Sequence, residues 1–187
     1  MVVLVLPRKE TTMPKISAIV AVDGDNLSYA LAELPNRFDP QRITAILCEI
    51  SGVAQKDAAL CYFSTAGIDR STRSMRGHGW INSMRVNGWT VITVPPSIRQ
   101  VKGGEYRRSG MPDSHIQRHI NHLLAAPTST GVKTIVLYTG DRAFQDLLSR
   151  AKQRGIYTVV VSTRHALSRT LREVANRVVL LDTYAPQ

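Results

Sequence analysis

The sequence predicts an α/β fold, a three-layer α/β/α sandwich with a mainly parallel central sheet. The chain has 187 residues and a hydrophobic content of 43%, enough to bury one sizeable core. Six short, continuous apolar runs have the length and composition of strands buried on both faces. Amphipathic stretches separate most of these runs, and such an alternation is typical of βαβ units in an open sheet.

The expected strands are rich in Val, Ile, Leu and aromatic residues and are bounded by polar residues or glycine. In chain order they are residues 16–23 (ISAIVAVD), 57–64 (DAALCYFS), 89–95 (WTVITVP), 133–140 (KTIVLYTG), 156–162 (IYTVVVS) and 177–182 (RVVLLD).

The expected helices show start and stop signals, such as Pro40 after Asp39 and a terminal Gly155. They lie within residues 39–53, 71–88, 113–126, 142–155 and 165–176. Two further segments are expected outside the strands and helices. The proline, glycine and basic residues of 95–112 predict a mobile surface loop. Residues 1–15 are expected to form an N-terminal arm or an extra strand, and residues 16–187 a single domain.

The charge predicts a polyanionic partner. The formal net charge is +10 and the isoelectric point is about 10.1, so nucleic acid is the first partner to consider. The apolar run near the N-terminus is too short to span a membrane and follows no basic residues, unlike a signal peptide. The two cysteines lie in apolar segments, which favours a reducing compartment. We therefore expect a cytoplasmic protein without membrane contact.

The candidate site follows from the predicted sheet, because ligands in such sheets bind beyond the carboxyl ends of the strands. That rule selects Asp23, Ser64, Thr65, Gly140 and Asp141. Asp113 opens the helix before the fourth strand and is expected to join them. Three carboxylates would then meet at one edge, and carboxylate oxygens are suitable ligands for Mg²⁺.

Several of these acidic residues also have a structural interpretation. Asp25 or Asn26 can cap the helix that follows a turn at Gly24, and capping is the favoured role for Asp25. Asp113 follows a proline and also suits a helix N-terminus. Asp23, at the strand tip, is the residue for which a functional role is favoured.

The histidines and tryptophans also have both a functional and a structural interpretation. His115, His119 and His122 fall on one helical face; a polar face or phosphate contacts are favoured over a zinc site. His115, being nearest Asp113, is expected to line the site. Trp80 and Trp89 are expected to pack in the core rather than to stack on bases.

Motifs along the chain resemble those of NYN domains, the PIN-like nucleases that include LabA-like proteins. The resemblance rests on Asp23, Gly24 and Asn26 after the first strand, on Gly110, Met111 and Asp113, on Gly140, Asp141, Phe144, Leu147, Leu148 and Gly155, and on residues 168–182. It covers residues 16–182 in order. It implies a PIN-like sandwich and metal-dependent hydrolysis of phosphodiesters, generally in RNA rather than DNA, by an endonuclease.

Site residues are implied by the same resemblance. The catalytic set is Asp23, Asn26, Asp113 and Asp141, of which Asp23, Asp113 and Asp141 would bind Mg²⁺ or Mn²⁺. The candidates for phosphate contacts are Arg73, Arg76, Lys102, Arg107, Arg108 and Arg142. Dimerisation is common among PIN-like proteins, so a homodimer is also an expectation.

Two alternatives remain open at this point. Ala143 stands where the family usually has a second acid, and fewer carboxylates bind a metal more weakly. The chain would then be a catalytically weakened module that binds nucleic acid or recruits a partner.

The second alternative is a haloacid-dehalogenase-like phosphohydrolase, suggested by VDGDNL, YFST and GDRAFQD. Asp23 would be its nucleophile and Asp25 its general acid/base, with Asp141 and Asp146 near Mg²⁺. Leu27, the lack of a cap domain and the amphipathic pattern around Asp146 argue against it.

Overall fold

The protein is built around a six-stranded sheet whose strands are all parallel, in the order β3-β2-β1-β6-β7-β8. The computed structural model describes residues 16–34, 38–65, 78–94, 97–100, 106–109, 112–126 and 131–184. The strands of this sheet are β1 (Ala18–Asp23), β2 (Ala58–Thr65), β3 (Thr90–Val94), β6 (Thr134–Tyr138), β7 (Tyr157–Ser162) and β8 (Arg177–Leu180).

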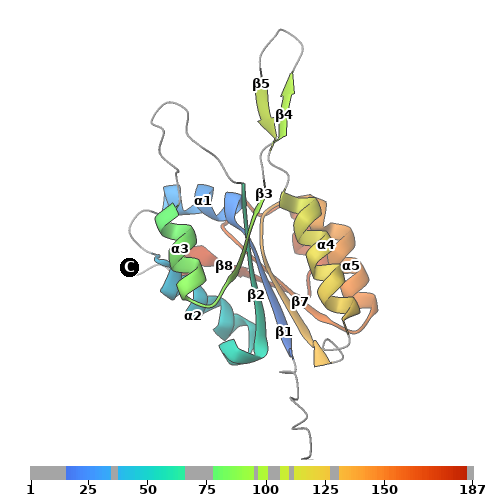
Figure 1. The fold of residues 1–187 in the computed structure, drawn as a ribbon. Coiled ribbons are helices and arrows are strands. Elements are labelled where there is room, and N and C mark those ends of the chain that lie inside the picture. Colours follow the sequence, from blue (N-terminus) through green and yellow to red (C-terminus); the bar gives the residue numbers. More distant parts are fainter. Residues whose placement is uncertain are drawn as a thin grey trace, which may run out of the picture.

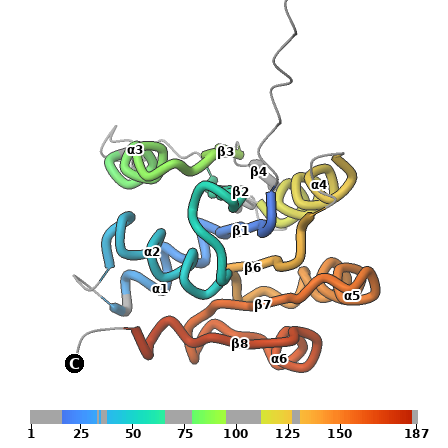
Figure 2. Tube along the Cα trace, turned by 90° about the horizontal axis from the view of Figure 1, so that it is seen from below, coloured from blue at the N-terminus to red at the C-terminus, as the bar shows by residue number. Residues whose placement is uncertain are grey.

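Helices cover both faces of the sheet (Figures 1 and 2). One layer contains α1 (Gly24–Glu33), α2 (Pro40–Ser51) and α3 (His78–Val86). The other contains α4 (Pro112–Ala125), α5 (Gln145–Gln153) and α6 (Arg169–Val174). The expected three-layer α/β/α sandwich is confirmed.

The two hydrophobic cores follow from the alternation of side chains along each strand. In β1, Val20 and Val22 pack in the core beneath α1, α2 and α3, whereas Ile19 and Ala21 pack in the core beneath α4, α5 and α6. All six residues of β1 are buried. A strand covered on both faces needs such a continuous apolar run, and this one ends on a carboxylate, Asp23.

The segment that differs most from its expectation is 95–112. Instead of an irregular loop, it contains β4 (Ser97–Gln100) and β5 (Tyr106–Ser109), which pair antiparallel as a two-stranded sheet. The hairpin projects beyond the carboxyl ends of the central strands (Figure 1).

The tryptophans pack in the core, as expected. Trp89 is 4% exposed, and its indole N–H donates a hydrogen bond of 2.7 Å to the hydroxyl of Thr44. Trp80 is half-buried and packs against the same core. Both side chains therefore join α3 and the start of β3 to the first helical layer.

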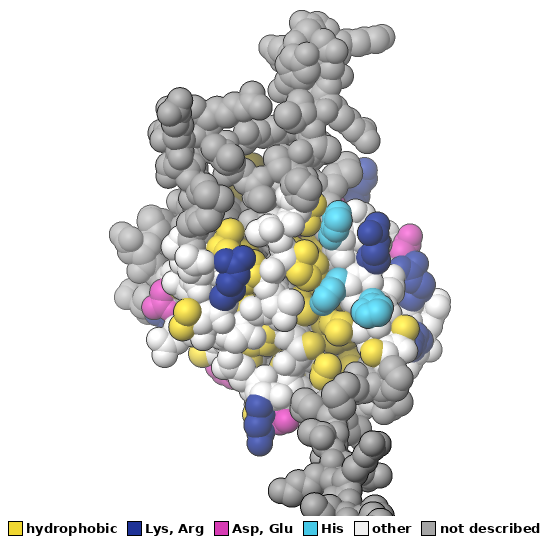
Figure 3. All heavy atoms as spheres, in the orientation of Figure 1, with side chains coloured by type: hydrophobic (Ala, Val, Ile, Leu, Met, Phe, Trp, Pro, Cys, Tyr) yellow, Lys and Arg dark blue, Asp and Glu magenta, His cyan; other side chains and the backbone are white. Residues whose placement is uncertain are grey.

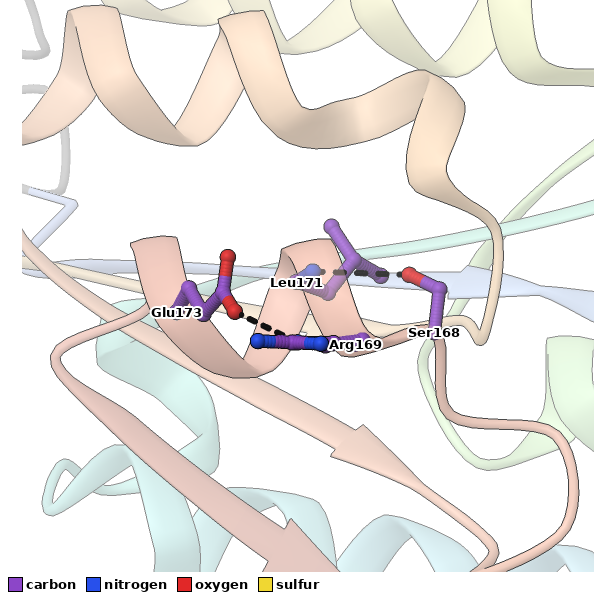
Figure 4. Close-up of polar contacts among 4 residues, drawn as sticks. All are labelled: Ser168, Arg169, Leu171 and Glu173. Atoms are coloured by element: carbon purple, nitrogen blue, oxygen red, sulfur yellow. Dashed lines mark hydrogen bonds and ion pairs between the residues drawn. The ribbon is translucent and has the colours of Figure 1, made fainter.

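The last helix is shorter than expected: α6 begins only after Ser168, which caps it, and the preceding residues form a turn (Figure 4). Arg169 and Glu173 pair across one turn of α6 at 2.8 Å, but their side chains are 91% and 60% exposed. Solvent screens such a pair, so we expect Arg169→Ala to lower the free energy of unfolding by only about 0.3 kcal/mol.

Urea denaturation checks this value, with Ser168→Ala as the comparison. Loss of the cap should cost more, about 0.5–1 kcal/mol. A loss above about 1 kcal/mol for Arg169→Ala would show that the ion pair is a significant contributor despite its exposure.

Candidate active site

An acidic pocket lies at the carboxyl ends of the strands, where the direction of winding reverses. β1 has β2 on one side and β6 on the other, and this switch point is where open α/β sheets bind ligands. The pocket has a volume of about 430 Å³. We call it the acidic pocket. The described residues that line it are Asp23, Asp25, Asn26, Ser28, Tyr29, Thr65, Pro112, Asp113 and Asp141.

Asp23 ends β1 and is 1% exposed. Oδ1 accepts hydrogen bonds from the backbone N–H groups of Asp25 and Asn26, at 3.1 and 3.2 Å. Oδ2 accepts from the side-chain amide of Asn26 at 2.6 Å and from the hydroxyl of Thr139 at 3.4 Å. Burial raises the pKa of Asp23, although these hydrogen bonds from Asn26 oppose the shift. Asp23 is thus both the N-cap of α1 and a rigidly held group of the pocket.

Asp25 does not cap the helix, contrary to the sequence-based interpretation. Because α1 begins at Gly24, directly after the strand, the capping position falls on Asp23. The carboxylate of Asp25 instead accepts hydrogen bonds from the backbone N–H (3.0 Å) and the hydroxyl of Thr65 at the end of β2. Asp25 therefore joins the start of α1 to the neighbouring strand.

Asp113 and Asp141 complete the acidic set, each from a different element. Asp113 is the second residue of α4 and is half-buried. Burial raises its pKa to about 6, and the nearby charges of Asp23, Asp141 and Asp25 add to the shift. Asp141 is exposed, and its Oδ1 accepts from the N–H of Ala143 at 2.9 Å. Asp113 is thus close enough to the other three carboxylates to be repelled by them.

Two hydrogen-bonded links fix the relative positions of these acids. The hydroxyl of Thr139 accepts from the N–H of Asp141 at 3.2 Å and donates to Asp23. The side-chain amide of Gln117, on α4, donates to the carbonyl of Ala143 at 3.0 Å. The first link joins β1 to the end of β6, and the second joins α4 to the turn after Asp141.

The family comparison agrees with this arrangement: the model of the NYN domain matches residues 17–182. The chain belongs to the NYN domain family. NYN domains are part of the PIN-like nuclease superfamily, whose members typically use divalent metals. A solved structure of a protein of unknown function from Vibrio parahaemolyticus has the same fold, with a TM-score of 0.67 and 21% identity, over 92% of this chain and 96% of that one. No curated protein matches the sequence.

The donor set of this NYN domain fits a hard divalent cation. Four carboxylates, an amide and several hydroxyls line the acidic pocket, and none of its described lining residues is basic; oxygen ligands of this kind suit Mg²⁺ and Mn²⁺. Within the described part of the chain, no three Asp, Glu, His or Cys side chains are grouped closely enough to hold an ion directly.

The structure describes only some of the residues that are predicted to contact phosphate groups. Arg142 is exposed and directly follows Asp141. Arg107 and Arg108 lie in β5, which projects past the carboxyl edge of the sheet (Figure 1). Arg73, Arg76 and Lys102 lie outside the described residues, as does the predicted N-terminal arm. Their roles in binding nucleic acid stay predictions.

The histidines of α4 do not line the acidic pocket, so the expectation for His115 is wrong. His115, His119 and His122 line a second pocket, of about 270 Å³, together with Phe63, Ile92 and Arg118; we call these six residues the histidine pocket. The helical period explains the difference, because two residues along a helix turn a side chain to another face.

Sequence reasoning missed several residues that the structure places at the acidic pocket. Ser28 lines the pocket, as does Tyr29, which is 80% exposed although it is aromatic. Thr139, just before the Gly-Asp motif, reaches the pocket through its hydrogen bond to Asp23, and Asp25 lines the pocket instead of capping a helix. The continuation of a helix directly from the Asp-Gly-x-Asn motif would have placed Ser28 and Tyr29 one turn beyond Asp25.

No described helix is long and apolar enough to cross a membrane.

Proposed function

We propose that this NYN domain is a divalent-metal-dependent ribonuclease, an endonuclease that acts on single-stranded or structured RNA in the cytoplasm. The observation that carries the proposal is the acidic pocket itself. The chain has 24 Lys and Arg residues against 14 Asp and Glu, yet four aspartates and no basic residue are among the described residues that line this pocket. Such a concentration of like charge costs stability unless a cation compensates it.

Asp113 and Asp141 are the groups best placed to hold Mg²⁺ or Mn²⁺. Asp113 has a raised pKa because of its burial and its acidic neighbours, and Asp141 has one oxygen that accepts no hydrogen bond from a described residue. Asp23 already accepts four hydrogen bonds, and the long one from Thr139 is the easiest to give up for a ligand. Asn26 acts on Asp23 as a positioning residue.

A bound divalent ion would polarise the phosphoryl group and lower the pKa of a coordinated water. The protein supplies the surrounding electrostatics. Arg142, together with the basic residues predicted to contact phosphates, would hold the negatively charged backbone of the RNA next to the carboxylates. Residues 16–187 would act as one domain, alone or as a homodimer.

The same scaffold without catalysis is the alternative function. Ala143 is exposed in the turn after Asp141 and provides no carboxylate, so a chain that binds RNA but holds its ion too weakly to cleave is the main competitor. The phosphohydrolase alternative is less well supported. Asp146 is not among the described residues of the acidic pocket, and the carboxylate of Asp25 accepts hydrogen bonds from Thr65.

The deciding experiment is a cleavage assay on labelled single-stranded RNA with Mn²⁺, with Mg²⁺ and with EDTA. Wild-type protein should cleave only with metal. Asp141→Asn should lose this activity, because it removes a negative charge from the pocket while an asparagine can still cap the following turn. Circular dichroism should show that the variant is folded.

A binding curve for the same RNA distinguishes the alternative. Tight binding without cleavage in any metal would establish the module that binds but does not cut. Cleavage that persists in EDTA, or in Asp141→Asn at the wild-type rate, would refute the proposed site.

A further inference from the structure

The histidine pocket shares no described lining residue with the acidic pocket and is chemically different from it. Histidine side chains gather on the surface over α4, with basic side chains beside them and apolar atoms between (Figure 3). Of the six lining residues, Phe63 and Ile92 come from β2 and β3, and the others from α4. The pocket combines apolar surface with a few polar groups, as small-molecule sites commonly do.

The floor of the pocket is built from two aromatic rings in contact. Phe63 is fully buried, and its ring meets that of His119 edge-on, with centroids 5.5 Å apart and an interplanar angle of 73°. Burial lowers the pKa of His119, and the charge of His122 lowers it further, so both effects favour the neutral form of the ring. A neutral imidazole both stacks on a base and exchanges hydrogen bonds with its edge.

The rim of the pocket provides positive charge and exposed donors. Arg118 and His122 are both exposed on α4. A guanidinium can pair with a phosphate through two parallel hydrogen bonds or stack on a base. Apolar and aromatic surface beside such a cation is complementary to a nucleotide, which has a planar ring and a charged phosphate.

The two pockets are connected through α4. Pro112 and Asp113, at its start, line the acidic pocket, and His115 begins the histidine pocket on the same helix. At a rise of 1.5 Å per residue, His119 lies about 9 Å along the axis from Asp113. A single strand with a phosphate at the acidic pocket would therefore have a neighbouring nucleotide within reach of the histidine pocket.

We propose that the histidine pocket binds one unpaired nucleobase of the RNA whose backbone lies at the acidic pocket. This inference rests on the proposed ribonuclease function. The base stacks on His119 above Phe63, and Arg118 contacts an adjacent phosphate. The volume of about 270 Å³ lies just below the range of typical small-molecule sites, about 300–1,000 Å³, and suits a single ring system. The enzyme would then select unpaired regions, because a base within a duplex is not available to enter.

A second copy of the chain is the other occupant to consider for this surface. Each copy has a formal net charge of +10, and Arg118 is exposed on this face, so two copies would bring like charges together. RNA has the complementary charge.

The test is a binding measurement in EDTA, where no metal-dependent cleavage interferes. A labelled single-stranded RNA of roughly ten nucleotides is compared with strands in which one base at a time is replaced by an abasic residue. Wild-type protein should lose about tenfold in affinity when the base in the pocket is removed. His119→Leu, which keeps apolar packing on Phe63, should bind intact and abasic strands equally well.

Two further variants distinguish the contribution of the base contact from the contribution of positive charge. Arg118→Ala should weaken binding to all strands alike and reduce the slope of log affinity against log salt by about one. Arg172→Ala removes the same charge from an exposed position on α6, at the other end of the sheet from β3 (Figure 2), and should leave discrimination against abasic strands intact. Melting temperatures confirm that each variant is folded.

Three outcomes would overturn the inference, and they differ in what they imply. If wild-type protein cleaves RNA but does not distinguish abasic strands, or if a folded His119→Leu variant still distinguishes them, the base site is refuted and the ribonuclease proposal stands. If wild-type protein neither binds nor cleaves RNA, both proposals are refuted. A wild-type dimer that His119→Leu converts to a monomer, with unchanged RNA affinity, would make this face a subunit interface.

Discussion

Asp23→Asn should reduce metal-dependent RNA cleavage by about a hundredfold or more, while the melting temperature stays the same or rises. Loss of one preorganised electrostatic group commonly costs this much in rate. The fold should tolerate the change because asparagine is as good an N-cap as aspartate, and the amide of Asn26 can turn to present its oxygen. Burial raises the pKa of Asp23, so its charge costs folding free energy at pH 7, and a neutral side chain removes that cost.

Asp39→Asn is the matched control, because the substitution and the capping role are the same. Asp39 is the N-cap of α2, and its Oδ1 accepts from the N–H of Arg42 at 2.7 Å. It is exposed and not among the described residues of the acidic pocket. Cleavage assays and thermal melts on both variants check the prediction. Equal activity of Asp23→Asn and Asp39→Asn would mean that Asp23 only caps a helix.

Gly140→Ala should destabilise the fold by about 3 kcal/mol, the upper end of the usual cost of overpacking. A Cβ at Gly140 would lie 2.1 Å from the carbonyl oxygen and 2.6 Å from the carbonyl carbon of Ala166. These are backbone atoms, so no side-chain rotation relieves the clash. The N–H of Ser168 also donates to the carbonyl of Gly140 at 3.0 Å, which holds the turn before α6 against this glycine.

Gly79→Ala is the same substitution at another position, and we expect it to stabilise the protein rather than destabilise it. Gly79 lies in α3, and a Cβ there meets nothing within 4 Å, so alanine should stabilise the helix by up to about 1 kcal/mol. Urea denaturation of both variants gives the comparison. A Gly140→Ala variant as stable as wild type would show that the turn at Ala166 moves easily away from the sheet.

The fold could be predicted from the sequence because its strands are continuous apolar runs. β1 and β7 have almost no polar interior positions, and such segments have few other stable arrangements. Residues 97–109 were the exception. Their glycines and arginines lack the apolar alternation of a strand, yet β4 and β5 pair antiparallel.

The site could be predicted where a residue lies at the end of a strand or at the start of a helix. Asp23 and Asp141 follow from the strand pattern, and Asp113 from its family resemblance, and all three line one pocket. The roles of Thr139 and Gln117 depend on hydrogen bonds between segments distant in sequence, which no local pattern reveals. The assignment of His115 failed because closeness along the chain was taken as closeness in space.

The pairing of β1 with β6 has a consequence for how the protein is made. Asp23 and Thr139 are 116 positions apart in sequence, and β6 completes one side of β1. A nascent chain still attached to the ribosome holds Asp23 long before β6 has been synthesised. Contacts of such sequence separation form late and slow folding. The acidic pocket would therefore be assembled only when most of the chain has been translated.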